Sequence, residues 1–202
     1  MNRPTPPDVL FESSLEALFL PSPELAQWAD ETFIAEDAVI ENDDHEHLRQ
    51  ARIGFVWTNE ANERRGRLIL GTAQLLPPSG DKWSVGRAVA QLREWFGDVP
   101  DFMITLYAPA AIVMDDASFL ALVYHELMHC AQRRDNEGQP MFNRETGRPV
   151  WAMRAHDIEQ FVSVVRQFGA DAAGVRAMID AAADTPLASD QQISIACGTC
   201  AR

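Results

Sequence analysis

The chain has 202 residues, 47% hydrophobic and 23% charged, a composition that suits one globular domain with a sizeable core and excludes a disordered chain. Thirty acidic against 17 basic side chains give a formal net charge of −13, which disfavours nucleic acid and anionic membranes as partners. No stretch approaches the roughly 20 apolar residues of a membrane span, and acidic residues interrupt the apolar N-terminal segment. We therefore expect a cytoplasmic protein with neither a signal peptide nor a membrane segment.

Proline dominates the beginning of the chain. Five prolines lie in residues 1–23, so we expect a poorly ordered, Pro-rich arm there. A helix over SPELAQWADETFI is predicted to start at a Ser22 cap. We expect the main domain to extend over residues 24–185 and a C-terminal tail over 186–202.

Strand and helix patterns alternate in the next part of the chain. RIGFVWT (52–58) and RLILGTAQLL (67–76) are apolar, are separated by a polar segment, and predict a pair of antiparallel strands. WSVGRAVAQLREWF has helical spacing and is followed by Gly97, a common helix stop. DFMITLYAP then predicts one more strand, ended by Pro109.

A second strong helix pattern follows this strand. It is expected from about Ala117 to Arg133, with Asp115, Asp116 or Ser118 as its cap. Apolar residues cover most of its circumference, which is typical of a helix in the centre of a domain. The predicted fold is therefore α+β, a small and mostly antiparallel sheet packed against helices that include this central one.

The sequence VYHELMHC lies on that helix and places His125, Glu126 and His129 in the order H-E-x-x-H. A chance occurrence of this pattern in such a chain has a probability on the order of 1 in 100. Residues four apart share a helix face, so the two imidazoles can bind one Zn²⁺ ion. Glu126 lies beside them, where a general base acting on a metal-activated water belongs.

A third ligand must come from another element. WAMRAHDIEQFVSVVRQF predicts a helix, and we favour His156 near its start as the ligand over Glu159. Asp157 or Glu159 would then orient an imidazole. His45 and His47 stand in a run of acidic residues and are expected in a solvated loop.

The order of these elements resembles the minimal zincin fold. VYHELMHCAQ and AHDIEQF resemble the metallopeptidases encoded by phages and prophages, over roughly residues 51–168. This resemblance implies a zinc-dependent peptidase acting on a protein or peptide in the host cytosol, with His125, His129 and His156 as ligands and Glu126 as base. It also implies that DFMITLYAP is the strand along the substrate cleft, where an extended substrate pairs with its edge.

Other zincin groups fit less well. The metzincin pattern would need Gly at position 132 and His at 135, where this chain has Gln132 and Asp135, and the gluzincin pattern meets Ser163 instead of Asp. The layout is distantly similar to SprT-like enzymes, which typically carry a zinc ribbon and work around DNA. This chain is acidic and has one C-x-x-C, so no DNA-related role is expected.

Several other residues carry weaker hypotheses. Cys197 and Cys200 form a single C-x-x-C that is an idle reduced pair, a dithiol, or half of a zinc site completed across a dimer, and Cys130 is expected to be a small buried side chain. Tyr107 and Tyr124 are expected in the core or an interface rather than as oxyanion donors, and Arg148 or Arg154 could bind a substrate carboxylate.

A second functional class also stays open. In it the protein is a non-catalytic binding or structural module, in which zinc only holds the helices together and Glu126 has no substrate. Four protein ligands, for example with Glu159 as the fourth, would favour that alternative.

Overall fold

The structure, a computed structural model, describes residues 2–12 and 16–197. They belong to two compact units, the first made of Met1–Arg154 and Gln191–Arg202 and the second of Ala155–Asp190. Helices pack with a small, mostly antiparallel sheet, so the predicted α+β class is confirmed. No helix in the described part of the chain is both long enough and apolar enough to cross a bilayer.

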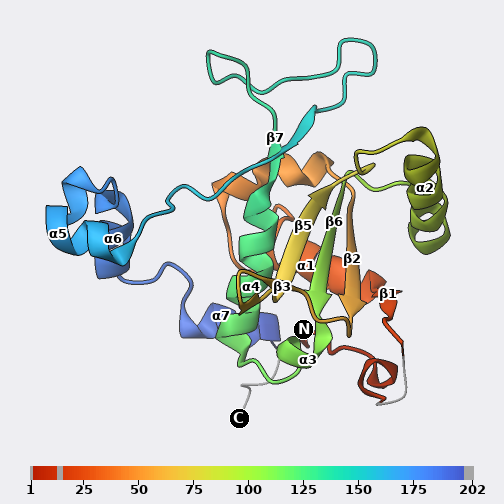
Figure 1. Cartoon of the computed structure of the whole chain (residues 1–202), viewed down its shortest axis with the longest axis horizontal. Coiled ribbons are helices and arrows are strands. Elements are labelled where there is room, and N and C mark those ends of the chain that lie inside the picture. Colours follow the sequence, from red (N-terminus) through yellow and green to blue (C-terminus); the bar gives the residue numbers. More distant parts are fainter. Residues whose placement is uncertain (1, 13–15, 198–202) are drawn as a thin grey trace. The chain divides into compact units, whose positions relative to one another are not determined.

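The first unit is built on one four-stranded sheet with the strand order β1-β2-β6-β5 (Figure 1). Its strands are β1 (Phe19–Pro21), β2 (Ile53–Thr58), β5 (Gly71–Leu75) and β6 (Phe102–Tyr107). The central pair β2 and β6 is parallel, and the outer pairs are antiparallel. Two short ladders accompany the sheet, β3 (Glu63–Arg64) with β4 (Arg67–Leu68) and β7 (Cys130–Gln132) with β8 (Trp151–Met153).

This order corrects two predictions. The segments that become β2 and β5 do not pair with each other, because β6 lies between them. The predicted cleft strand DFMITLYAP is consequently interior, and β5 forms the edge on its side of the sheet. The apolar β2 is buried along nearly its whole length, as an interior strand requires, whereas the small and polar residues of β5 alternate between half-buried and exposed.

The helices of this unit are α1 (Pro23–Phe33), α2 (Lys82–Phe96), α3 (Ala108–Ala111), α4 (Asp116–His129) and α7 (Asp190–Cys197), with 3-10 helices η1 (Asp8–Phe11) and η2 (Asp43–Gln50). The predicted Ser22 cap is confirmed, since its hydroxyl accepts the Leu25 N–H at 3.2 Å. Asp81 caps α2, and Gly97 follows α2 with a φ of 78°, which glycine adopts without strain.

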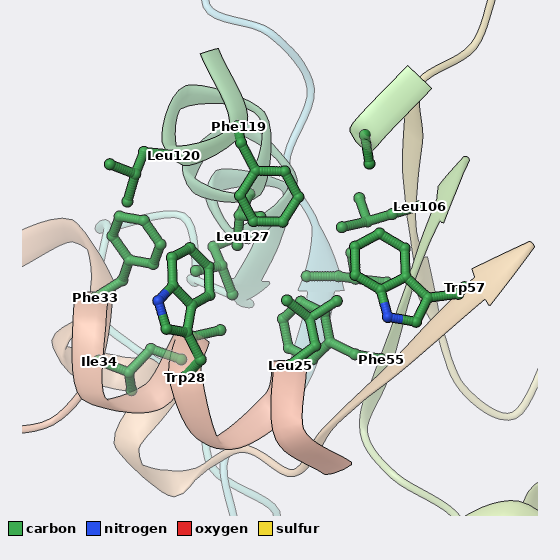
Figure 2. Packing of buried hydrophobic residues seen from close by; sticks show 14 of the residues in the cluster. Leu25, Trp28, Phe33, Ile34, Phe55, Trp57, Leu106, Phe119, Leu120 and Leu127 are labelled. Atoms are coloured by element: carbon green, nitrogen blue, oxygen red, sulfur yellow. The ribbon is translucent and has the colours of Figure 1, made fainter. Parts of the chain in front are cut away.

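The core lies between one sheet face, α1 and α4 (Figure 2). Trp28 and Phe33 of α1 meet Phe119 and Leu120 of α4, while Phe55 and Trp57 come from β2. Phe102, Ile104 and Leu106 of β6 complete this face and are fully buried. The rings of Trp28 and Phe119 have centroids 5.5 Å apart, so α1 and α4 are locked together by aromatic packing.

Arg3 and Leu10 of the N-terminal arm pack on this core, contrary to the expectation of a poorly ordered segment. The Arg3 guanidinium lies 4.2 Å from the centroid of the Phe119 ring and donates to the Asp116 carboxylate at 3.1 Å. Leu10 of η1 is buried. The beginning of the chain therefore holds the start of α4.

The second unit contains α5 (Val162–Ala172) and α6 (Arg176–Ala183). The predicted helix that would begin near His156 is wrong, because residues 154–161 are irregular and α5 starts at Val162. The tryptophan that opens that segment, Trp151, belongs to β8 instead.

Candidate metal centre

The rotation of α4 about its axis is set by its buried face. Asp115 caps the helix by accepting the Ser118 N–H at 2.8 Å. Phe119, Val123 and Leu127 are fully buried, which leaves the side of α4 that carries the histidine pair away from the apolar core. The helix ends at His129 rather than Arg133, because Cys130 takes an extended conformation and begins β7.

His125 and His129 converge as their spacing predicts. Their Nε2 atoms are 3.2 Å apart, and their ring planes are inclined at 85°. Two nitrogen ligands about 2.0–2.1 Å from a tetrahedral zinc ion would lie about 3.3 Å from each other. The pair therefore fits two adjacent ligands of one ion.

The backbone of Arg154 fixes the tautomer of His129. His129 Nδ1 lies 2.7 Å from the Arg154 carbonyl oxygen, so Nδ1 must carry the proton and donate it. The Arg154 N–H donates in return to the His129 carbonyl at 2.9 Å. The lone pair of His129 is thereby placed on Nε2, the nitrogen that faces His125.

His156 follows Arg154 by two residues and belongs to the second unit. His156 is therefore two residues along the chain from the Arg154 backbone that holds the His129 ring. The three histidines form a group that could hold a metal ion. Within its own unit, His156 Nδ1 lies 3.7 Å from Glu159 Oε1, beyond hydrogen-bond length.

Glu126 is 4% exposed, an unusual position for a carboxylate. It lies against the first residue of the edge strand, since a Cβ built on Gly71 would stand 2.9 Å from Glu126 Oε1. Any side chain at position 71 would occupy the space of the carboxylate. Because residue 71 is glycine, strand β5 can lie directly against Glu126 of helix α4, the candidate general base.

His45 and His47 are not in a solvated loop, as the sequence had suggested. Both lie on η2, where His45 and Leu48 share the buried side at the three-residue spacing of a 3-10 helix. The His45 ring packs against Tyr124 with the ring centroids 4.8 Å apart and the planes inclined at 54°, and burial lowers the pKa of His45 to about 4. The imidazole of His47 contacts the Cys130 carbonyl through Nε2 at 2.8 Å.

The remaining candidates take structural places. Cys130 is buried as predicted, and burial raises the pKa of its thiol to about 12, with the Glu126 charge adding to the effect. Tyr124 packs against the core as expected, whereas Tyr107 lies on the other face of the sheet. Cys200 and the side chain of Cys197 lie outside the described residues.

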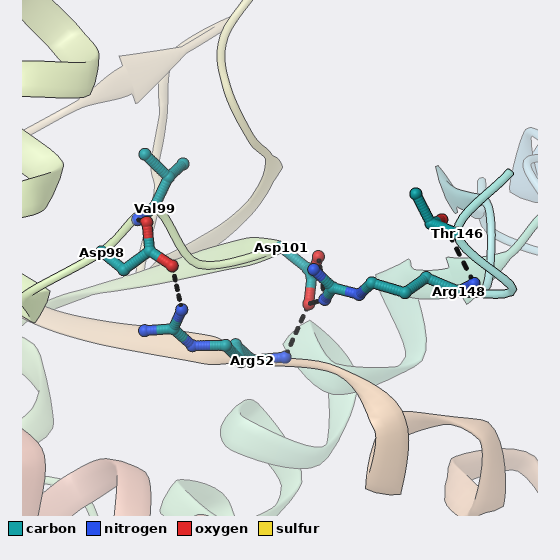
Figure 3. A network of polar contacts seen from close by, with 6 residues as sticks. All are labelled: Arg52, Asp98, Val99, Asp101, Thr146 and Arg148. Atoms are coloured by element: carbon teal, nitrogen blue, oxygen red, sulfur yellow. Dashed lines mark hydrogen bonds and ion pairs between the residues drawn. The ribbon is translucent and has the colours of Figure 1, made fainter. Parts of the chain in front are cut away.

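The two arginines proposed for substrate binding differ in their surroundings. Arg148 donates to both oxygens of Asp101, at 3.1 and 3.0 Å, and Asp101 also accepts the Arg52 N–H (Figure 3). The Arg148 guanidinium is thus already paired with the Asp101 carboxylate. Arg154 lines a groove of about 980 Å³, and its guanidinium Nη1 lies 3.8 Å from Oδ2 of Asp44, which lines the same groove.

The fold and these side chains define a candidate metal-binding protein of the α+β class. One of its helices, α4, carries both a histidine pair and a buried glutamate. The chain belongs to the family described as "Putative phage metallopeptidase", whose model matches residues 26–183. The resemblance to phage metallopeptidases is thereby confirmed. No curated protein and no solved structure matches the chain.

Proposed function

We propose that the protein is a zinc-dependent peptidase, with His125, His129 and His156 as the metal ligands and Glu126 as the general base. The observation that carries the proposal is the histidine pair, whose Nε2 atoms stand 3.2 Å apart with Glu126 next along the same helix. Imidazole nitrogens are good ligands for zinc, and three protein ligands leave a fourth position open. Membership of a metallopeptidase family supports the reaction class.

Zinc supplies Lewis acidity, which polarises a peptide carbonyl and lowers the pKa of water. The protein supplies proton transfer and orientation. Glu126 takes the proton from the attacking water and delivers it to the leaving amine. Its burial between α4 and Gly71 fixes the carboxylate, so that little reorganisation is needed during the reaction.

Strand β5 is the proposed docking edge for an extended substrate. The Tyr107 N–H donates to the Leu70 carbonyl and the Leu76 N–H to the Asp101 carbonyl, so even-numbered residues of this segment face β6. By alternation, the N–H and C=O groups of Gly71, Ala73 and Leu75 point to the edge. A substrate strand paired there would cross beside Glu126.

His156 is a better candidate for the third metal ligand than Glu159. His156 is two residues along the chain from Arg154, whose backbone makes two hydrogen bonds with His129, whereas Glu159 lies three residues further along and its side chain is 85% exposed. The proposed substrate is a cytoplasmic protein or peptide. The net charge of −13 argues against nucleic acid.

The test combines metal analysis with a peptide-cleavage assay. Wild-type protein is compared with Glu126→Gln, His156→Ala and Glu159→Ala, the last as the matched control for the third ligand. We expect about one zinc ion per chain in wild type, Glu126→Gln and Glu159→Ala, and loss of zinc in His156→Ala. Cleavage should disappear in Glu126→Gln and His156→Ala.

Two results would overturn the proposal. Zinc lost with Glu159→Ala but kept with His156→Ala would replace the third ligand. Zinc bound by wild-type protein that cleaves no peptide would favour the alternative of a zinc-stabilised binding or structural module.

A further inference from the structure

The sheet face turned away from α4 carries a pocket of about 570 Å³. We call it the back-face pocket, and six of its lining residues define it: Glu60, Thr72, Gln74, Trp95, Met103 and Tyr107. The register explains the placement, because Met103, Thr105 and Tyr107 alternate along β6 with the buried core residues. This pocket lies wholly within the first unit.

The back-face pocket adjoins the edge strand. Thr72 and Gln74 of β5 line it, and so does Gly71, whose other side lies against Glu126. In a strand paired with β5, the residue opposite Gly71 directs its side chain toward the Glu126 face. The two residues flanking it direct theirs to the back face, the side of the pocket.

The lining indicates which side chain fits. Trp95, Met103, Val56 and Phe19 give apolar and aromatic walls, and threonine, asparagine and glutamine side chains add polar groups. Among the described lining residues, Glu60 is the single acidic one, and lysine, arginine and histidine do not occur. The Glu60 backbone is held in place because its N–H donates to Thr58 Oγ1 at 3.0 Å.

We propose that the back-face pocket is a specificity subsite for a lysine or arginine side chain of the substrate, next to the residue that pairs with Gly71. The aliphatic stem lies along the apolar wall and the cationic end reaches Glu60 at the exposed rim. The protein's charge of −13 attracts such a substrate. This inference rests on the proposed function, because it takes β5 as the docking edge.

The test uses a series of quenched fluorescent peptides with an alanine-rich extended sequence. Each position in turn carries lysine or norleucine, which matches the lysine stem but lacks its charge. The ratio of kcat/KM for the two peptides is measured for wild type, Glu60→Gln and Glu60→Arg. Glu63→Gln is the matched control, since Glu63 is exposed and does not line the pocket.

At one position, wild type and Glu63→Gln should favour lysine over norleucine by about tenfold, the value of one charged hydrogen bond. The preference should vanish in Glu60→Gln and turn against lysine in Glu60→Arg, with zinc content unchanged in all four proteins. A lysine preference that Glu60→Gln leaves intact, or its absence at every position in wild type, would overturn the subsite.

A binding experiment separates this inference from the peptidase proposal. Zinc-loaded Glu126→Gln protein, with and without Glu60→Gln, is titrated against the same labelled peptides by fluorescence anisotropy. Lysine-dependent binding that needs Glu60, together with no cleavage by wild type, would refute the peptidase and retain the subsite. Cleavage by wild type without lysine-dependent binding would refute the subsite and retain the peptidase proposal.

Discussion

Gly71 is the residue whose replacement most directly tests the position of Glu126. In Gly71→Ala, the new Cβ would lie 2.9 Å from Glu126 Oε1 and 3.0 Å from Leu106 Cδ2, so the carboxylate must move. We expect cleavage to fall on the order of 10²-fold, the usual result of a misplacement of about 1 Å. Zinc content should stay at the wild-type level, which elemental analysis on the assayed sample will show.

Gly86→Ala on α2 is the matched control, because a Cβ there meets nothing within 4 Å. It should leave cleavage unchanged and raise thermal stability slightly, since alanine is the better helix former. Equal activity of Gly71→Ala and Gly86→Ala would mean that Glu126 does not act from its observed position.

His45 makes stability depend on pH. Its Nδ1 contacts the Phe33 carbonyl at 3.3 Å, and Nε2 has no hydrogen-bond partner among the described residues. Desolvation lowers its pKa from 6.5 to about 4, outweighing the Phe33 hydrogen bond. Between these values the unfolded chain binds the proton and the native protein does not, so the free energy of unfolding rises with pH across this window.

His45→Asn keeps a donor toward Phe33 and removes the titrating group. Its unfolding free energy should depend less on pH than that of wild type, by up to about 3 kcal/mol between pH 6.5 and pH 4. Urea unfolding at steps of pH measures this difference. Parallel curves for the two proteins would show that His45 is not buried in its neutral form.

Among the elements, the segment between β7 and β8 (133–150) is tied to the sheet through Arg148 and Asp101 (Figure 3). Asp101 lies just before β6, and Asp98 holds Arg52 at 2.6 Å beside it. In Arg148→Ala the segment loses this attachment. We expect faster cleavage within residues 134–149 by an added protease, measured by mass spectrometry, with global stability nearly unchanged because the Arg148 side chain is 57% exposed.

Arg144→Ala is the control on the same segment, as Arg144 is also exposed. Its rate of proteolysis should match that of wild type. If both variants were cut equally fast, the loss of any arginine, and not the Asp101 contact, would explain the effect.

The elements that local chemistry determines were predicted best. Gly97 ends α2, Ser22 caps α1, and His125 and His129 lie on one side of α4, each as predicted. Strand order was predicted wrongly, because pairing between distant segments leaves no local signal and β6 follows α2 in the chain.

The surroundings of single side chains were also hard to predict from local patterns. The acidic run around His45 hid the burial of that residue on η2, for which the three-residue spacing to Leu48 was the available signal. The spacing of apolar residues predicted a helix that starts near His156, but in the structure the helix begins only at Val162. The closeness of Gly71 to Glu126 follows from tertiary packing alone.

For the whole molecule, the chain leaves the first unit after Arg154 and returns to it at Gln191. Helix α7 then packs on helix α1 of the first unit, where the indole N–H of Trp28 donates to the Ala196 carbonyl at 2.8 Å. Gln192 reaches the Val39 carbonyl at 3.0 Å, and Ala196 is fully buried. The stability of the first unit therefore depends on residues that follow the entire second unit in sequence.

A chain ended after Asp190 should unfold at a lower urea concentration than the full chain. The Trp28 N–H would exchange its protein acceptor for water, which costs about 0.5–1.5 kcal/mol, and apolar surface of α1 would be exposed. Trp28→Phe in both chain lengths completes a double-mutant cycle that isolates the Trp28–Ala196 hydrogen bond from the rest of the deletion. The substitution should be less costly in the short chain than in the full one. An equal cost in both would show that α7 does not dock on α1 through this bond.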